Sequence, residues 1–289
     1  MATLLDFRRR IRSVKNTQQI TRAMKFVAAA RLRRAQERAL AARPYAQQIA
    51  RVLRSTMARL ENPQHPLLAA RPVEKILVVV LTGERGLCGA FNSNILRKAV
   101  ELFRANAGKK IIGLPVGKKG RDFLKKQGME FAGEYVNVLA RVEFGTVREI
   151  SKIVTEAYAS GEVDAVYAVF SEFKSVIAPN LAVEKLLPIE SIAGEESSSA
   201  GAVQVDYIYE QPAEELLDRL LPRYVETQVL RAMLESSAAE HAARMTAMES
   251  ATKNAGEVIE ALTLHMNKVR QAAITREIIE IVSGASSTA

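Results

Sequence analysis

A narrow seven-residue repeat runs through the first sixty residues and limits what this chain can fold into. Alternating steps of three and four residues from Ile11 meet an apolar side chain at eleven of fifteen positions, five of them alanine. A narrow seam of this kind is typical of a coiled coil, and alanine in the seam lets a partner backbone approach closely. The fifteen seam positions are Ile11, Val14, Gln18, Thr21, Lys25, Ala28, Leu32, Ala35, Ala39, Ala42, Ala46, Ile49, Leu53, Thr56 and Leu60.

The repeat predicts an N-terminal coiled-coil helix over residues 1–62. Pro44 removes one hydrogen bond from this helix, so we expect a bend near Arg43. The stretch "ENPQHP" ends the helix, because Pro63 and Pro66 cannot continue it.

A second coiled-coil helix is predicted over residues 212–285. No proline follows Pro222, and alanines crowd the first half of the segment after it. A helix from Arg223 to Ser283 is about 90 Å long at 1.5 Å per residue. Few globular helices reach that length, so this helix needs a partner along its axis. Since both end segments attach to the same side of the central region, we expect them to pair as an antiparallel, two-stranded shaft.

The central region, residues 73–210, changes from a seven-residue repeat to alternating strands and helices. The continuous apolar run "KILVVVLTG" is typical of a strand buried on both faces. An amphipathic helix follows over residues 92–108, with Asn92 or Ser93 as its N-cap. The stretches "NLAVEKLLPIE" and "VQVDYIYE" are expected to add antiparallel strands. The predicted fold class is α/β plus a long antiparallel coiled coil, with a Rossmann-like domain as the foot of the shaft.

Basic residues are concentrated in the N-terminal helix. Residues 1–60 hold fifteen Lys and Arg against two acids, for a net charge of +13, whereas the whole chain carries +9. The rest of the chain is therefore net −4. Four arginines cannot all face one partner helix: Arg31, Arg33, Arg34 and Arg38. With so few acids nearby, they favour an acidic external surface around the shaft; a solvated basic face is the simpler alternative.

Apolar residues gather at the far end of the C-terminal helix. At 100° per residue they spread over about 160° of its circumference, which is wider than one slim helix can cover. Folding of this end against Leu4, Leu5 and Phe7 would cover part of it, and we expect an outer collar to cover the rest. The apolar residues are Ile274, Ile278, Ile279, Ile281 and Val282.

Two glycine-rich stretches imitate phosphate-binding loops. "GERGLCG" (83–89) lacks the spacing of a dinucleotide loop, and "GLPVGKK" (113–119) is too short for a P-loop and lacks its Ser or Thr. Both are interpreted as tight strand-to-helix turns. The single cysteine, Cys88, excludes an internal disulfide, and the three histidines are isolated. We therefore predict no catalytic, cofactor-binding or metal-ligating residue.

Four segments together resemble the γ subunit of F-type ATP synthases. They are "RIRSVKNTQQITRAMKFVAAARLRRAQ" (10–36), "RGLCGAFNSNI" (85–95), "SAAEHAARMTAME" (237–249) and "ITREIIEIVSGAS" (274–286). The resemblance implies a central rotor shaft that turns inside a ring of α and β subunits. The foot would lie on the membrane-embedded c ring beside the ε subunit. Rotation would couple ion flow to ATP synthesis, or hydrolysis in reverse, with nucleotide and magnesium bound in the ring and not by this chain.

The resemblance also implies roles for individual residues. Met24 corresponds to a coupling methionine beside Arg22 and Lys25; packing in the seam is its plainer alternative. The basic residues Arg31, Arg33 and Arg34 correspond to positions that face an acidic loop of β. Further polar positions that help to transmit rotation are Arg244, Gln271, Thr275 and Glu280. Contacts with the c ring correspond to Tyr207 and Glu210, whose alternative is an ordinary sheet edge.

The resemblance implies a peripheral protein on the cytoplasmic face of the bacterial inner membrane, associated with it through the c ring, with no nucleic-acid partner. A coiled coil that binds nucleic acid through residues 8–59 would instead show salt-sensitive DNA binding. An enzyme built on the central domain would bind ATP or NAD.

Overall fold

The computed structural model describes residues 3–57, 60, 65–175, 179–189 and 212–287. The chain divides into two units, one of Met1–Ala29 with Arg244–Ala289 and one of Ala30–Ala243. Two long helices take part in both units: α1 (Leu4–Met57) and α5 (Ala213–Ser287), of 54 and 75 residues. The prediction of long helices at both ends is confirmed. Helix α1 continues through Pro44 without a break, and the predicted bend near Arg43 stays a prediction.

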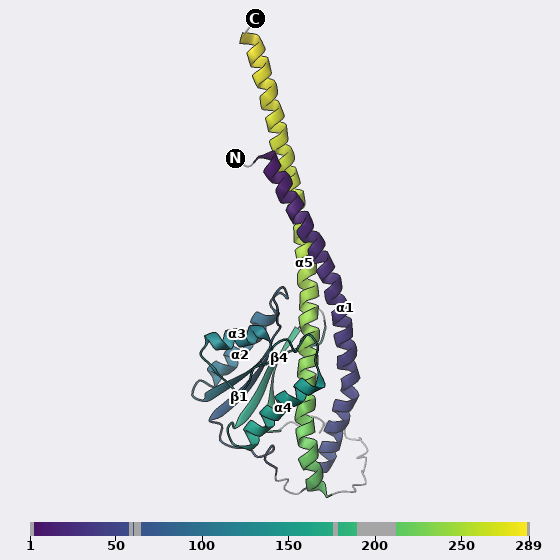
Figure 1. Ribbon diagram of the computed structural model, residues 1–289, viewed down its shortest axis with the longest axis vertical. Coiled ribbons are helices and arrows are strands. Elements are labelled where there is room, and N and C mark those ends of the chain that lie inside the picture. Colours follow the sequence, from purple (N-terminus) through teal and green to yellow (C-terminus); the bar gives the residue numbers. More distant parts are fainter. Residues whose placement is uncertain (1–2, 58–59, 61–64, 176–178, 190–211, 288–289) are drawn as a thin grey trace, which may run out of the picture. The chain divides into compact units, whose positions relative to one another are not determined.

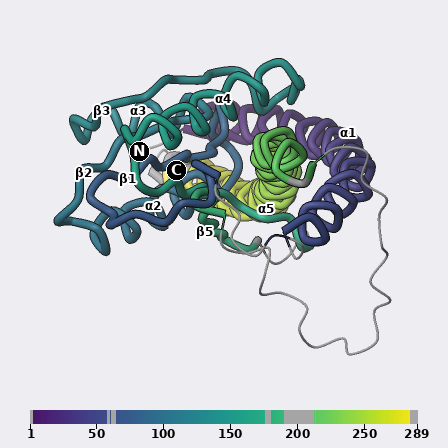
Figure 2. The backbone as a smooth tube through the Cα atoms, turned by 90° about the horizontal axis from the view of Figure 1, so that it is seen from below, coloured from purple at the N-terminus to yellow at the C-terminus, as the bar shows by residue number. Residues whose placement is uncertain are grey.

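The seam predicted from the repeat is the inner face of α1. All fifteen seam positions are buried or half-buried, and Leu53 is fully enclosed. In the first unit the N-terminal part of α1 runs beside α5 (Figure 1). In the second unit the later part of α1 and the first part of α5 again lie side by side in both views (Figures 1 and 2). Burial along a single stripe explains why small alanines alternate with long basic side chains in this helix.

The second unit contains a five-stranded sheet in the order β3-β2-β1-β4-β5. The first four strands in that order are parallel to one another, and β5 pairs antiparallel with β4. The strands are β1 (Lys75–Leu81), β2 (Lys110–Val116), β3 (Glu130–Phe131), β4 (Ala165–Phe173) and β5 (Pro179–Leu187). The apolar run is therefore a central strand, as predicted, and the added strand at 179–187 is antiparallel.

Helices cover both faces of this sheet. On one face, α4 (Phe144–Ala159) and the first part of α5 join a large apolar core that also takes in Leu53 of α1. On the other face, α2 (Phe91–Ala105) and α3 (Lys118–Lys126) pack over a second cluster that includes Cys88. The α/β fold predicted for the foot is confirmed, and Leu53 shows how the seam of α1 continues into the core of the domain.

The start of α2 differs from the sequence-based prediction. The predicted cap of α2 is wrong: its N-cap is Ala90, and no side chain caps the helix. Asn92 Oδ1 instead accepts a hydrogen bond from the Gly83 amide at 2.8 Å, so this side chain ties the first turn of α2 to the loop after β1. The predicted strand "VQVDYIYE" lies outside the described residues.

Candidate functional site

The two helices of the first unit form an antiparallel pair. As residue numbers rise along α1 they fall along α5. The Phe7 ring packs on His265 with centroids 5.0 Å apart, the Thr21 and Thr252 hydroxyls lie 2.8 Å apart, and Lys25 pairs with Glu249 at 2.5 Å. These contacts determine the register of the shaft in this unit.

Of the predicted coupling residues, Lys25 is a seam position, and Arg22 and Met24 lie near it on α1. Lys25 is half-buried and ion-paired across the helices, whereas Arg22 is exposed. Met24 is half-buried beside the seam. Its position is compatible both with seam packing and with contact to an outer partner. Arg244, on α5, is also half-buried in this unit.

The basic residues that follow along α1 point to solvent. Arg31, Arg33 and Arg34 are all exposed. Arg33 pairs with Glu37 one turn later, at 3.1 Å, on the same helix. An exposed ion pair of this kind adds little to stability. These three side chains are therefore available to a partner outside the shaft, as the sequence predicts.

The end of α5 continues beyond the N-terminus of α1. Because Phe7 lies beside His265, the residues after about 270 pass the start of α1. Gln271, Thr275 and Glu280 are exposed there, and the Thr275 hydroxyl donates to the Gln271 carbonyl oxygen at 3.0 Å. Their predicted role in transmitting rotation stays a prediction.

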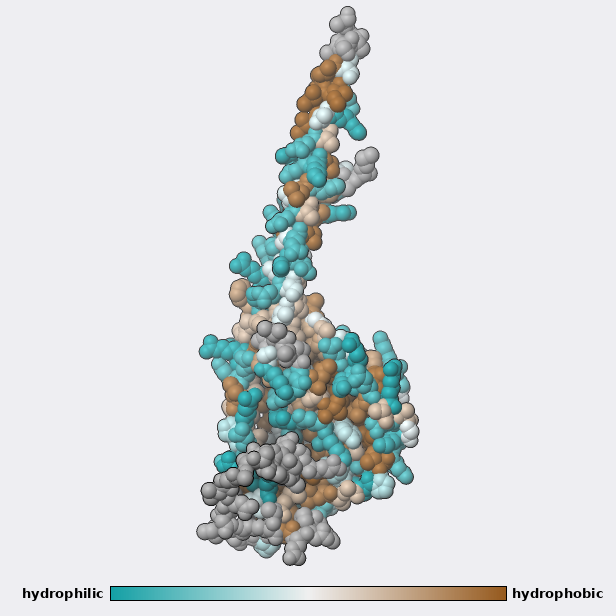
Figure 3. Space-filling model, turned by 180° about the vertical axis from the view of Figure 1, so that it is seen from behind, coloured by the Kyte–Doolittle hydropathy of each residue, from teal (hydrophilic) through white to brown (hydrophobic). Residues whose placement is uncertain are grey.

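The large apolar residues of this end are exposed as well. Their exposed fractions run from 48% at Ile274 to 71% at Ile281. Figure 3 shows brown side chains gathered near the end of the helix. Five large exposed apolar side chains on one short helical segment are typical of a surface that binds a partner. We call Ile274, Ile278, Ile279, Ile281 and Val282 the apolar tip.

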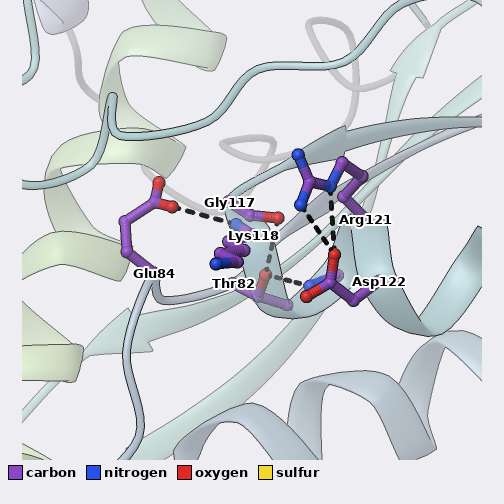
Figure 4. A network of polar contacts seen from close by, with 7 residues as sticks. Thr82, Glu84, Gly117, Lys118, Arg121 and Asp122 are labelled. Atoms are coloured by element: carbon purple, nitrogen blue, oxygen red, sulfur yellow. Dashed lines mark hydrogen bonds and ion pairs between the residues drawn. The ribbon is translucent and has the colours of Figure 1, made fainter.

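The two glycine-rich stretches meet at the carboxyl ends of β1 and β2 (Figure 4). Thr82 Oγ1 accepts a hydrogen bond from the Gly120 amide at 2.7 Å. The Glu84 carboxylate accepts from the Lys118 amide at 3.0 Å, at the N-terminus of α3. That terminus is electropositive and is where nucleotide-binding folds hold phosphate. Here a carboxylate of the chain itself occupies the position.

The glycines of this region serve close backbone approach. Gly117 has φ of 112°, and a Cβ atom at this position would lie 1.9 Å from the Thr82 carbonyl oxygen. Only glycine fits such a turn. The interpretation of "GLPVGKK" as a tight turn is confirmed by this geometry.

Other predicted sites can be placed only in part. Tyr207 and Glu210 lie outside the described residues. Cys88 is buried with its thiol near the Asn92 amide, at 3.3 Å. The described residues contain no group of three or more His, Cys, Asp or Glu side chains placed to hold a metal ion. Within them, no helix combines the length and apolarity that a membrane crossing requires.

The sequence analysis missed a charge cluster in the second unit, in which Glu235 is buried and Arg231 and Glu184 are half-buried. Arg231 on α5 donates to the Glu184 carboxylate of β5, and Glu235 lies one turn further along α5. Burial raises the pKa of Glu235, although Arg231 acts to lower it. The signal in the sequence was the pair of acids in the alanine-rich stretch "LESSAAEHAA", where an apolar seam would exclude charge.

Comparisons with known proteins agree over the whole length of the chain. The family model described as ATP synthase matches residues 3–288. The ATP synthase gamma chain of Solibacter usitatus (strain Ellin6076) is 48% identical, with 99% of both chains covered. That of Desulforamulus reducens (strain ATCC BAA-1160 / DSM 100696 / MI-1) is 50% identical, again over 99% of both.

Solved structures show the same fold. A chain from the central stalk and c ring of the Tetrahymena thermophila mitochondrial ATP synthase is 27% identical with a TM-score of 0.59, over 80% of this chain and 99% of that one. A chain from the Euglena gracilis mitochondrial ATP synthase gives 0.69 at 21% identity, over 99% and 94%. With a whole-length family match and relatives near 50% identity, the chain belongs to the ATP synthase gamma chain family.

Proposed function

We propose that this chain acts as a non-catalytic rotor shaft that transmits rotation between a membrane c ring and the catalytic ring of α and β subunits. As a member of the gamma chain family it is the central rotor stalk of an ATP synthase. The proposal assigns the chemistry to the α and β subunits. The paired helices carry torque, and the α/β domain is the foot beside the ε subunit.

The exposed apolar tip is the observation that carries this proposal. Exposure of Ile and Val side chains on successive turns of a helix is unfavourable in water. Burial of each such side chain stabilises a protein by about 1.5–3 kcal/mol. All five side chains of the apolar tip are exposed to solvent in the described part of the chain. A collar formed by the surrounding subunits would bury these side chains from all sides. An apolar contact without directional hydrogen bonds also permits rotation within the collar.

The exposed basic residues suit the second contact with the ring. Arg31, Arg33 and Arg34 would face acidic side chains on β, and each charge would be partly desolvated on contact. Met24 and Arg22 would lie nearby on the same helix, with Arg244 opposite on α5. Tyr207 and Glu210 are proposed to reach the c ring. The chain would be peripheral, on the cytoplasmic face of the bacterial inner membrane, and held there through that ring.

Charge reversal tests the proposal directly. The variant carries Glu in place of Arg31, Arg33 and Arg34, and is assembled with the other synthase subunits in lipid vesicles. Because all three side chains are exposed, we expect the shaft to fold normally while ATP-driven ion pumping per ATP hydrolysed falls severalfold. Unchanged pumping would contradict an acidic partner at this position.

A control with the same change in net charge separates position from charge. Its three reversed residues are exposed on α2 and α3 of the α/β domain: Arg97, Arg104 and Lys125. We expect this variant to lose less coupling than the first. Binding of the purified chain to duplex DNA, abolished by salt, would favour the nucleic-acid alternative instead.

A further inference from the structure

Torque must pass between α5 and the α/β domain, and polar contacts join the two within the unit Ala30–Ala243. This inference rests on the proposed rotor function. The Ser237 hydroxyl donates to the Leu139 carbonyl oxygen at 3.0 Å in a buried position. Glu226 pairs with Arg148 of α4 at 3.4 Å. The link that joins α5 to the sheet edge is centred on Arg231, whose side chain is 33% exposed.

The side chain of Arg231 reaches from α5 to the antiparallel edge strand of the sheet, β5. Its guanidinium donates to the Glu184 carboxylate on β5 and to the Gln228 side chain at 3.1 Å. Burial acts to lower the pKa of Arg231, but Glu184 and Glu235 raise it. The cation is thus held in its charged form by two acids from two different elements.

Glu235 extends the cluster toward α1. Glu235 is 8% exposed, and its Oε2 atom is buried without a hydrogen-bond partner in the described part of the chain. The charges that act on it come from Arg231 on its own helix, Glu172 on β4, Glu184 on β5 and Arg43 on α1. Charges from α1, α5 and two strands of the sheet therefore act on this cluster.

The surrounding contacts are apolar and carry no direction. Val225, Val229 and Met233 of α5 are buried in the main core. A helix in such an environment can turn slightly about its axis while it loses little contact area, since hydrophobic burial depends on area and not on angle. A guanidinium fork bonded to a carboxylate depends on angle as well as distance. Directional contacts are therefore what resists twist.

We propose that the cluster of Arg231, Glu184 and Glu235 is a torsional clamp. It stops α5 from turning against the α/β domain when the foot is driven and the shaft is loaded. Its role in the rotor is positional, because none of the three residues touches a reacting atom. The clamp contributes stiffness more than stability, because partly exposed ion pairs add little to stability and buried ones can often be replaced by apolar residues without loss of stability.

That difference between stiffness and stability provides the test. We would assemble complexes with Arg231→Met, Glu184→Leu and Glu235→Met combined, so that no charge of the cluster is left uncompensated. A gold rod on the exposed position Ala107→Cys would report the angle of the α/β domain. We expect thermal unfolding close to that of the parent, and at least a twofold larger variance of the angle during pauses between steps.

Two further variants make the result decisive. Arg231→Lys keeps the charge but loses the planar fork, so we expect a variance between the parent and the triple variant. Lys98→Met removes an exposed pair within α2, Lys98 to Glu101 at 3.0 Å, and should leave the variance unchanged. Should the triple variant fail to assemble, Arg231→Lys carries the test alone.

The possible failures are distinguishable. A variance equal to the parent's in the folded triple variant, or in Arg231→Lys, overturns the clamp while rotation itself continues. A parent complex whose α/β domain does not rotate during ATP hydrolysis overturns the proposed function instead.

Discussion

Enlarging one seam alanine should force the two helices of the shaft apart. Ala28 is 2% exposed and lies one turn along α1 from Lys25, whose ammonium pairs with Glu249. Replacing it by leucine adds three carbon atoms at a position that is already enclosed. Overpacking of this kind costs about 1–3 kcal/mol. If the first unit unfolds as a domain of 60–100 residues, each kcal/mol lowers its Tm by about 4–8 °C.

The assay is thermal unfolding of the purified chain, followed by circular dichroism at 222 nm. Ala30→Leu is a matched control, because Ala30 lies two residues away on the exposed side of the same helix. We expect Ala28→Leu to lower the Tm of the shaft by about 5–20 °C and Ala30→Leu to change stability by less than about 0.5 kcal/mol. Equal effects at the two positions would refute the alanine seam.

Three further predictions concern other parts of the molecule. Met24→Lys adds a cation beside Lys25, so the ratio of ion pumping to ATP hydrolysis should fall more than the yield of assembled complex; equal losses would indicate packing alone. Gly117→Ala should destabilise the α/β domain by more than about 3 kcal/mol in urea unfolding, because of its positive φ and the clash with Thr82; Gly145→Ala, with open space around it, is the control. Burial raises the pKa of Glu235 above 4.5. The folded chain therefore binds the carboxyl proton of Glu235 more tightly than the unfolded chain does. As a result, the free energy of unfolding falls as the pH rises from about 4.5 through the folded pKa. Glu235→Gln should remove that decline, seen as a gain over the parent at pH 8 that is absent at pH 4; a gain of the same size at both would argue against a titrating carboxyl.

Local pattern determined the elements of this protein. A seven-residue repeat and a continuous apolar run are properties of neighbouring residues, so the long helices, the buried strand at 75–81 and the exposed Arg31 could be predicted from the sequence. The strand Glu130–Phe131 was missed because two residues carry no period. The cap of α2 was mistaken because Asn92 bonds Gly83, nine residues earlier, in place of its own helix.

Only the tertiary structure decided which distant residues meet. The register of Phe7 with His265 follows from packing between the two helices of the first unit, and it shows where α5 passes the start of α1. The contact of Arg231 with Glu184 joins a helix to a strand 47 residues away, and no local period encodes such a pair. The reason is physical: periodicity reports which face of an element is buried, whereas the identity of its neighbour depends on how all elements fill the same core.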